Sequence, residues 1–262
     1  SVVVAELKLP GPGSRVHALA VLPDGHRAAV GTSDGIVVWD TREALHDTSA
    51  TIACASGVRA LVVAHSGRLV AGCQDGKLRV VDVGAGAVVA TVAAHSRPVS
   101  AMAALLDGRV ASVSVSFEIR VGDLGTGACV ARLKGHTGII TALAVLPDGR
   151  LASGSKDNTV RLWDTVGGTY SSCTGSVRDH QSEVCALAVL PGHRLASLSA
   201  TDYTIKVWDT CDDVGSLLAR RSIAFGSSIA LHALVALPGN RLAAGGESGV
   251  YLWQLPSPGA WR

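Results

Sequence analysis

The segment GTSDG, Gly31 to Gly35, matches the G-x-S-x-G pattern in which a serine acts as a nucleophile. That chemistry requires a sharp turn from a strand into a helix, with the serine exposed at its tip. Here short apolar segments with the composition of strands flank the motif on both sides. The same place reads GCQDG at residues 72–76 and GSKDN at residues 154–158. We therefore interpret Ser33 as a turn residue and predict that the chain has no catalytic residue.

Histidine and cysteine could also act as metal ligands, and the chain has nine histidines and six cysteines. They recur about 40 residues apart rather than at the short spacing of metal ligands. The sequence contains no C-x-x-C pair, no dinucleotide fingerprint and no phosphate-binding loop. We therefore predict no metal site and no cofactor. The cysteines have the pattern of small buried side chains in a cytoplasmic or other reducing intracellular compartment.

The composition excludes several classes of protein. Apolar residues make up 48% of the chain and charged residues 17%, against about 25% charged residues in an average soluble domain. The longest weakly polar run, residues 83–94, is shorter than the roughly 18 residues of a membrane helix. The net charge is +2, and the basic residues are scattered singly, which argues against direct nucleic-acid binding. High apolar content without a membrane segment predicts strands that are covered on both faces.

The elements that must position these residues follow from an internal repeat. The phrase ALAVLPDGR at residues 142–150 returns in five related forms. Its second residue falls at Leu19, Leu61, Met102, Leu143, Leu187 and Leu234, so the intervals are 42, 41, 41, 44 and 47 residues. Each copy has a short apolar run, a turn, a second run, a polar turn and two further runs with strand character. This pattern predicts an all-β protein with four antiparallel strands in each copy.

The period, the Trp-Asp pairs and the Gly-His before some copies resemble WD40 repeats. The pairs are Trp39-Asp40, Trp163-Asp164 and Trp208-Asp209. The resemblance covers essentially the whole chain and implies one domain, residues 1–262. It implies a six-bladed β-propeller, in which each blade is a four-stranded antiparallel sheet.

The way in which the strands close is a separate prediction. After Trp253 the remaining QLPSPGAWR contains two prolines, which cannot take part in a regular strand ladder. The last sheet therefore lacks its fourth strand, while residues 2–9 form a spare apolar segment before the first copy. Propellers of this family close by using one end of the chain to complete the blade formed by the other. We predict closure by the N-terminal strand, residues 2–9.

The resemblance also implies a structural role for histidine. In WD40 blades a His, a Ser, the turn Asp and the Trp form a hydrogen-bonded chain that satisfies buried polar groups. The fourth copy offers His136, Ser153, Asp157 and Trp163, and the fifth copy offers His180, Ser197, Asp202 and Trp208. The third copy has His95 but carries Ser116 and Gly122 in place of the Asp and the Trp. We therefore expect the complete chain only in the fourth and fifth copies.

Function in this family depends on surfaces rather than on catalysis. In WD40 propellers, residues at the start of the inner strand and just before the turn Asp line one face. Here these positions include Arg15, His17, Arg59, Gln74, Lys156, Glu183, Thr201, His232 and Glu247. Aromatic residues are only 4% of the chain, which favours a shallow polar interface. We predict a non-enzymatic scaffold or adaptor for protein or peptide partners, within a multi-subunit complex. The alternative is a structural subunit of a large assembly that could include RNA.

Overall fold

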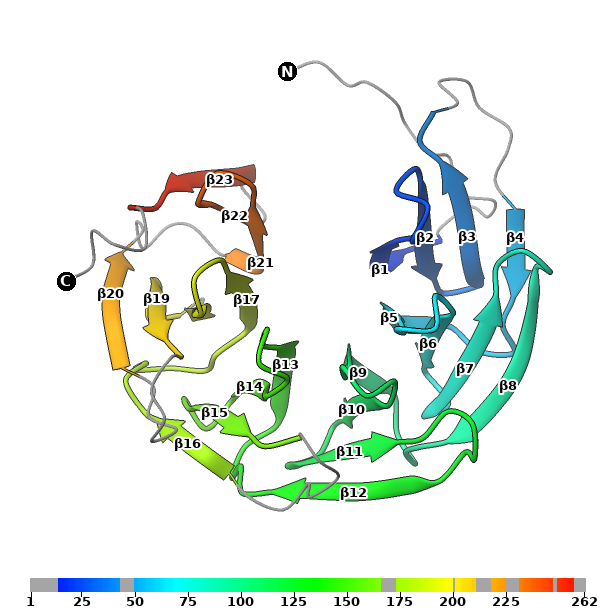
Figure 1. The fold of residues 1–262 in the computed structure, drawn as a ribbon, viewed down its shortest axis with the longest axis horizontal. Helices are drawn as coiled ribbons and strands as arrows, with labels where there is room; N and C mark the ends of the chain where they lie inside the picture. Colours follow the sequence, from blue (N-terminus) through cyan, green and yellow to red (C-terminus); the bar gives the residue numbers. More distant parts are fainter. Residues whose placement is uncertain are drawn as a thin grey trace. The chain divides into compact units, whose positions relative to one another are not determined.

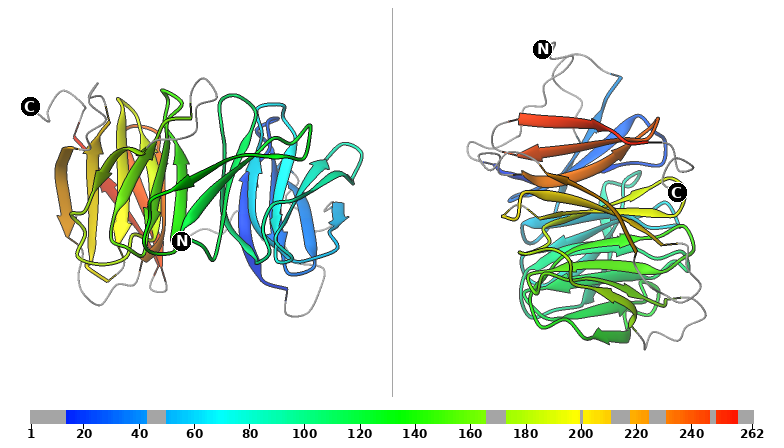
Figure 2. Two further views of the ribbon diagram at one scale, coloured as in Figure 1. Left: turned by 90° about the horizontal axis from the view of Figure 1, so that it is seen from below. Right: turned by 90° about the vertical axis from the view of Figure 1, so that its left-hand side faces the viewer.

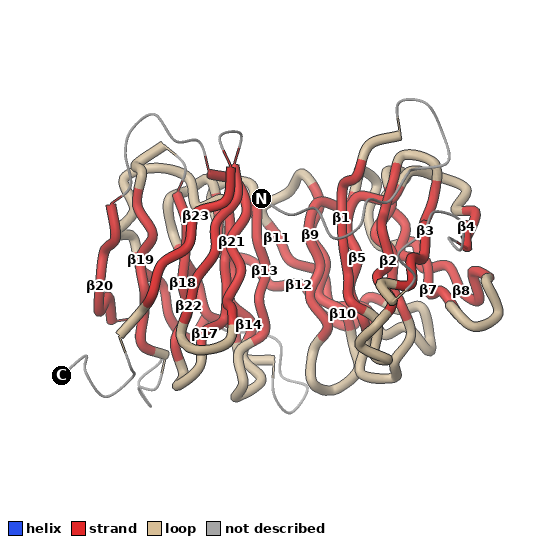
Figure 3. The backbone as a smooth tube through the Cα atoms, turned by 90° about the horizontal axis from the view of Figure 1, so that it is seen from above, coloured by secondary structure: helices blue, strands red, loops and turns tan. Residues whose placement is uncertain are grey.

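The computed structural model describes residues 14–42, 50–165, 173–199, 201–210, 218–224, 231–246 and 249–256. Their strands form six antiparallel sheets, five with four strands and one with three (Figure 1). The described part of the chain contains no helix, and therefore no helix long and apolar enough to cross a membrane (Figure 3). The prediction of six repeated antiparallel sheets is confirmed.

Each sheet is a simple meander of strands that are consecutive in the sequence. The first sheet contains β1 (Val16–Val21), β2 (Arg27–Thr32), β3 (Gly35–Asp40) and β4 (Ala50–Ala53). The second contains β5 (Val58–Val63), β6 (Leu69–Cys73), β7 (Lys77–Asp82) and β8 (Ala87–Ala93). The third contains β9 (Val99–Ala104), β10 (Val110–Ser114), β11 (Glu118–Gly122) and β12 (Cys129–Lys134).

The remaining three sheets follow the same plan. The fourth contains β13 (Ile140–Val145), β14 (Leu151–Ser155), β15 (Val160–Trp163) and β16 (Cys173–Val177). The fifth contains β17 (Ala186–Leu190), β18 (Arg194–Ser199), β19 (Thr204–Asp209) and β20 (Leu218–Ala224). The sixth contains β21 (Leu231–Leu237), β22 (Arg241–Gly246) and β23 (Gly249–Gln254).

The sheets belong to two compact units. One unit runs to Val115 and takes in Arg120–Val130, whereas the other takes in Ser116–Ile119 and continues from Ala131. In the first unit the first strands of neighbouring sheets, β1, β5 and β9, pack side by side. In the second unit β13, β17 and β21 do the same (Figure 2). Each unit therefore repeats one contact, between the first strands of consecutive sheets.

The turn between the first and second strands explains why the phrase LPDGR returns in related forms, as LPDGH in the first sheet. In the first sheet the Gly25 N–H donates to the carbonyl of Leu22 at 3.0 Å, and Gly25 has a φ of 74°. The Asp24 carboxylate accepts the backbone N–H of Arg27 at 2.9 Å. Glycine adopts this left-handed conformation without the steric cost that other residues meet. In the fifth and sixth sheets, His193 and Asn240 also take left-handed φ values of 53° and 59°.

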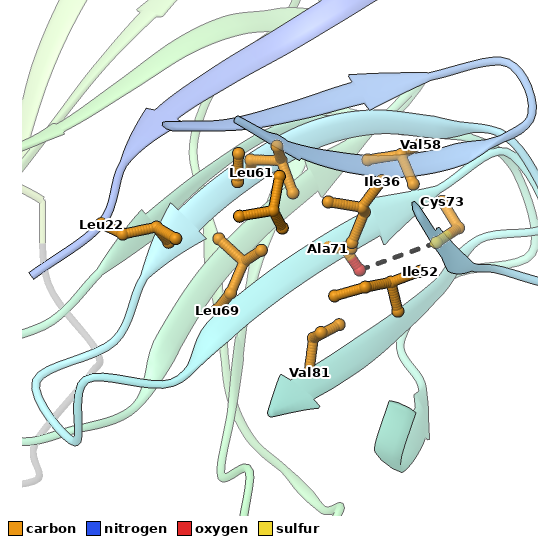
Figure 4. Packing of buried hydrophobic residues seen from close by; sticks show 11 residues of the cluster. Leu22, Ile36, Ile52, Val58, Leu61, Leu69, Ala71, Cys73 and Val81 are labelled. Atoms are coloured by element: carbon orange, nitrogen blue, oxygen red, sulfur yellow. Dashed lines mark hydrogen bonds between the residues drawn. The ribbon is translucent and has the colours of Figure 1, made fainter. Parts of the chain in front are cut away.

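The second strand of each sheet carries the core. Every residue of β6, β10, β14 and β18 is buried. A cluster around β6 illustrates the packing, with Leu69 and Ala71 surrounded by side chains of the first and second sheets (Figure 4). Burial on both faces explains why these strands read as continuous apolar and small residues rather than as an alternating pattern.

A glycine on the second strand lets neighbouring sheets approach closely. A Cβ atom added to Gly31 would lie 2.7 Å from Cγ1 of Val58 in the next sheet. The corresponding distance is 2.6 Å from Gly72 to Val99 and 2.6 Å from Gly154 to Val184. These distances are far below a normal carbon–carbon contact. The three glycines therefore set the spacing between consecutive sheets.

The first strands of the first and sixth sheets, β1 and β21, each pack against one neighbouring sheet of their own unit. In β1, Leu19 and Val21 are 69% and 70% exposed, because β1 packs on only one neighbouring sheet of its unit. In the sixth sheet Val235, on its first strand β21, is exposed too, as is Val250 of the third strand. The strand predicted to complete the sixth sheet, residues 2–9, lies outside the described residues. Closure by that strand stays a prediction.

Candidate interaction surface

The fourth sheet brings its four predicted polar and aromatic side chains together. His136, just before β13, donates from Nδ1 to Oδ2 of Asp157 at 2.7 Å. Its Nε2 accepts the hydroxyl of Ser153 at 2.7 Å. The indole N–H of Trp163 donates to the same hydroxyl oxygen at 2.8 Å. All three contacts are satisfied by one tautomer of the imidazole, with its proton on Nδ1.

The fifth sheet repeats this arrangement almost unchanged. His180 donates to Asp202 at 2.8 Å, and its other ring nitrogen accepts the hydroxyl of Ser197 at 2.7 Å. Trp208 donates its indole N–H to Ser197 at 2.8 Å. Both tryptophans are buried, as are both serines. In each sheet the chain of hydrogen bonds links the turn before the third strand to the tryptophan at the end of that strand.

A threonine extends each network, and the sequence analysis did not include it. Thr159 donates its hydroxyl to Oδ1 of Asp157 at 2.5 Å, and Thr204 donates to Oδ1 of Asp202 at 2.7 Å. Each threonine stands two residues after the aspartate, in D-N-T and D-Y-T. That spacing is typical of a local turn in which a side chain caps the backbone. The shared spacing was the signal that could have identified both residues.

Burial and hydrogen bonding determine the charge states in the networks. Burial lowers the pKa of His136, and the hydrogen bond to Asp157 only partly offsets this, so the imidazole is neutral at pH 7. Burial raises the pKa of Asp157, but hydrogen bonds from Thr159, from the Thr137 N–H and from His136 outweigh it and hold that pKa at about 2. Burial likewise lowers the pKa of His180, and the pKa of Asp202 is also lowered.

These networks have the residue types of a hydrolytic triad and its His–Asp and Ser–His contacts, but their serines are buried. A nucleophilic serine must be exposed to substrate and must give its proton to the histidine. Ser153 and Ser197 are 0% exposed, and the oxygen of each accepts a tryptophan N–H. The arrangement joins strands and turns rather than presenting a reactive group.

The third sheet keeps only half of the network. His95 lies 2.9 Å from the Ser112 hydroxyl through its Nε2 atom. The turn residue Ser116 donates to the carbonyl of Glu118 at 3.2 Å instead of contacting the imidazole as an aspartate does. Gly122 stands where the fourth and fifth sheets have tryptophan. The third sheet therefore has a shorter buried polar chain than its two successors.

The turn that contains Ser33 joins two strands. Gly31 lies on β2 and Gly35 on β3, so the G-x-S-x-G motif has no helix after it. Ser33 is exposed, and the adjacent Asp34 carboxylate accepts a hydrogen bond from the Ser14 hydroxyl. This strand–turn–strand geometry differs from that of a nucleophile elbow.

In the first unit the predicted surface residues are all exposed. Arg15, His17, Arg59 and Gln74 lie at the start of β1, on β1, on β5 and in the turn between β6 and β7. Nη1 of Arg59 lies 3.4 Å from Nδ1 of His17, so the structure brings these two side chains together. The backbone N–H of Gln74 donates to the carbonyl of Gly57 at 2.8 Å, which fixes the turn.

In the second unit the predicted surface residues form polar pairs. Nζ of Lys156 lies 2.8 Å from Oε2 of Glu183, which joins the fourth sheet to the fifth. Thr201 shares a hydrogen bond with the hydroxyl of Ser182, and His232 is exposed on β21. Glu247 lies outside the described residues. Within the described ranges no group of three or more His, Cys, Asp or Glu side chains could hold a metal ion.

Comparisons with known proteins agree with the repeat analysis. The sequence matches the family described as WD domain, G-beta repeat, over residues 127–164 and 171–209. These segments contain the third strands and tryptophans of the fourth and fifth sheets. No curated protein matches the chain.

Two solved structures show similar folds. One is a chain of the crystal structure of the Mitotic Checkpoint Complex, with 19% identity, a TM-score of 0.81, and coverage of 94% of this chain and 76% of that chain. The other is the computationally designed Ika8 protein, with 30% identity, a TM-score of 0.73, and coverage of 94% and 73%. The family match and the 30% identity to the designed protein, together with the repeated sheets, show that the chain belongs to the WD40-repeat family, and the solved structures agree with its β-propeller fold.

Proposed function

We propose that this chain is a non-catalytic interaction scaffold that binds a protein or peptide partner. The observation that carries the proposal is the contrast between two sets of polar side chains. The His–Ser–Asp groups are buried and bonded to one another, whereas Arg15, His17, Arg59 and Gln74 are exposed. Exposed polar side chains on rigid strands are suited to recognition, because few degrees of freedom are lost when a partner binds.

The charges of the exposed residues indicate the chemistry of the partner. In the first unit, Arg59 lies beside His17, and Arg15 precedes the same strand. Arginine is enriched among residues that dominate binding energy. We propose that this group contacts an acidic or hydrogen-bond-accepting segment of the partner. In the second unit, the ion pair of Lys156 with Glu183 favours a neutral polar segment.

The experiment is a pull-down with quantitative mass spectrometry, using the wild-type chain and two charge-reversal variants. Arg59→Glu changes the proposed surface, and Arg68→Glu changes an exposed arginine in the turn between β5 and β6. We expect Arg59→Glu to reduce recovery of the partner at least tenfold, about 1.4 kcal/mol, and Arg68→Glu to leave it unchanged. Equal recovery by both variants, with equal melting temperatures, would contradict the proposed surface.

A second candidate function is a structural subunit held permanently in a large assembly, including one that contains RNA. It is favoured by the apolar side chains of β1 that the rest of the first unit leaves uncovered, Val16, Leu19 and Val21. Such a patch is typical of surfaces that are covered in an assembly. Size-exclusion chromatography of a native extract, with and without ribonuclease, distinguishes the two functions. A stable high-mass complex supports this second function, and a complex that dissociates with ribonuclease indicates RNA within it.

We also propose a cytoplasmic or other reducing intracellular location. It is supported by the cysteines of the described residues, none of which is joined to another by a disulfide bond. Fractionation of cells followed by immunodetection tests this location.

A further inference from the structure

A hollow of about 480 Å³ lies between the first and second sheets, within the first unit, and is partly open to solvent. It is formed by the turn between β1 and β2, the turn between β5 and β6, and the residues that follow β7. Its volume falls within the range of sites that bind small molecules, about 300–1,000 Å³. Arg59 and Gln74 of the proposed partner surface lie at the opposite ends of β5 and β6. The hollow is therefore a separate candidate site.

Apolar side chains form part of the lining of the hollow. Leu22 and Val81 are buried and belong to the apolar cluster of the first and second sheets (Figure 4). Pro23 and the half-buried Val83 also line the hollow. An apolar group of a ligand that lies against these side chains is removed from water, which favours its binding.

An arginine that lines the hollow lacks the partner that its counterparts have. In every sheet an arginine ends the turn between the first and second strands. The side chains of the other five have partners, which are Asp24 for Arg27, Asp107 for Arg109, Asp148 for Arg150, Asn240 for Arg194 and the carbonyl of Pro238 for Arg241. In the second sheet the turn reads H-S-G-R, so Ser66 stands where the first, third and fourth sheets have aspartate. Among the described residues, no hydrogen bond or ion pair engages the guanidinium of Arg68.

An aspartate lies next to this arginine. Leu69 of β6 pairs with Val81 of β7, and Arg68 precedes Leu69 while Asp82 follows Val81. The two charged residues therefore stand beside each other at one end of the sheet, and both line the hollow. No ion pair joins them in the described part of the chain, and Oδ1 of Asp82 accepts the backbone N–H of Ala85 at 3.0 Å. A guanidinium and a carboxylate oxygen thus keep hydrogen-bonding capacity for a ligand.

We propose that the hollow binds a free α-amino acid with an apolar side chain. The carboxylate of the ligand accepts hydrogen bonds from Arg68, a pairing that the forked guanidinium favours. The ammonium of the ligand, one carbon away from the carboxylate, donates to Asp82. The apolar side chain of the ligand lies against Leu22 and Val81. A zwitterion thus matches the neighbouring opposite charges, and its side chain matches the apolar lining.

Two other classes of ligand fit less well. A phosphate or another polyanion would meet two carboxylates in the hollow, those of Asp24 and Asp82, and the second arginine, Arg27, is already paired with Asp24 at 2.5 Å. A purely apolar ligand would cover the charged groups of Arg68 and Asp82 without giving them a partner, which costs free energy.

The test titrates the folded full-length chain with L-leucine and with L-phenylalanine and follows its backbone amide resonances by NMR. We expect saturable shifts at Gly67 and Gly84, which line the hollow, and none at Gly76, in the turn at the other end of the second sheet. 4-Methylpentanoate lacks the ammonium of leucine, and L-leucinamide lacks its carboxylate. Each should bind at least roughly tenfold more weakly than L-leucine, because one charged hydrogen bond is lost.

Variants assign each end of the ligand to one side chain. Arg68→Gln should weaken the binding of L-leucine by roughly tenfold or more and remove its preference over L-leucinamide. Asp82→Asn should remove the preference for L-leucine over 4-methylpentanoate, since asparagine keeps the acceptor of the Ala85 N–H but not the charge. Arg59→Gln, the matched loss of one arginine near the start of β5, should leave the affinity unchanged.

Three results would overturn the proposal. The first is that neither amino acid shifts the resonances of Gly67 and Gly84 in the wild-type chain. The second is that L-leucine, 4-methylpentanoate and L-leucinamide bind with equal affinity, and the third is that Arg59→Gln weakens binding as much as Arg68→Gln. Because Arg59 and Arg68 have opposite expected effects in this titration and in the pull-down, the two experiments can fail independently.

Discussion

At the scale of single residues, the same three chemical groups can either catalyse or hold a structure together. His136 contacts an aspartate and a serine at 2.7 Å, as a catalytic histidine does. The difference lies in the fourth member, because the indole N–H of Trp163 occupies the serine oxygen. The sequence could indicate these four side chains, since their order and spacing repeat in the fifth copy. It also repeats the spacing of Thr159 after Asp157, a signal that the sequence analysis did not use.

The networks predict unequal effects for substitutions at the turn. Asp157→Ala removes the acceptor of His136, of Thr159 and of the Thr137 N–H, so the free energy of unfolding should fall by roughly 1–3 kcal/mol or more. Ser116→Ala in the third sheet removes one hydrogen bond to a carbonyl and should change the free energy of unfolding by about 0.5 kcal/mol. Chemical denaturation of both variants beside the wild type measures the difference. Equal losses would show that the network does not stabilise the fourth sheet.

Trp163→Ala should be more costly than either change, at about 3–5 kcal/mol, because it also leaves a cavity in the core. The same denaturation series measures this loss. Trp163→Phe is its matched control, since it removes the indole N–H but keeps most of the buried volume. A loss for Trp163→Phe as large as that for Trp163→Ala would assign the effect to the hydrogen bond rather than to packing.

The buried histidines predict that stability falls on mild acidification. The pKa values of His136 and His180 are lowered by burial, whereas imidazoles in the unfolded chain take up protons near pH 6.5. Below pH 6.5 the unfolded state therefore binds more protons, and the free energy of unfolding decreases until the folded-state pKa is reached. Urea unfolding at about pH 7.5 and about pH 5.5 measures the change.

The double variant His136→Gln/His180→Gln is the control for this prediction, and its stability should depend less on pH in that range. A wild-type chain that becomes more stable on acidification would contradict the assignment of neutral, buried imidazoles. The Asp157 carboxylate affects the free energy of unfolding in a separate, lower range of pH. Its lowered pKa contributes stability above the unfolded value of about 3.9, which is lost as the pH falls through about 2.

At the scale of strands and sheets, the sequence indicated the strands themselves because apolar runs and turn signals repeat in register. It did not indicate which strands are exposed. The runs of β1 and β5 are similar in composition, yet β5 packs between two sheets and β1 packs against one. The exposure of a strand depends on which sheets pack beside it. The residues of a single repeat do not specify those neighbouring sheets.

The glycine of the second strand gives a prediction with a matched control within the chain. Gly154→Ala should lower the free energy of unfolding by about 1–3 kcal/mol, since the added methyl group would meet Val184 of the fifth sheet at 2.6 Å. Gly245 occupies the same position in the sixth sheet, and an added Cβ would have no atom within 4 Å. Gly245→Ala should therefore be neutral or stabilise the chain by up to about 1 kcal/mol. Thermal and urea unfolding compare the two, and a destabilised Gly245→Ala would mean that its strand is covered.

At the scale of the whole molecule, the repeat predicts how the ends of the chain are used. The sixth sheet has three strands among the described residues, and an uncovered strand edge promotes association between molecules. If residues 2–9 supply the missing strand, deletion of residues 1–10 should lower the melting temperature and increase self-association. Deletion of residues 257–262, which include a proline, is the control. A truncated chain that remains monomeric and equally stable in light scattering and thermal unfolding would refute the closure.

The glycine–valine contact between sheets also bears on how such a chain can grow. Val58 at the start of β5 packs against Gly31, and Gly72 of the same sheet packs against Val99. The second sheet therefore supplies a valine to one contact between sheets and a glycine to the next. A tandem duplication of residues 58–98 would therefore place Gly72 of the first copy against Val58 of the second. That pairing joins the same two residue types as the contacts already present. The addition of one repeat thus requires no new type of contact between sheets. Recombination within the gene could therefore add or remove a sheet in a single event.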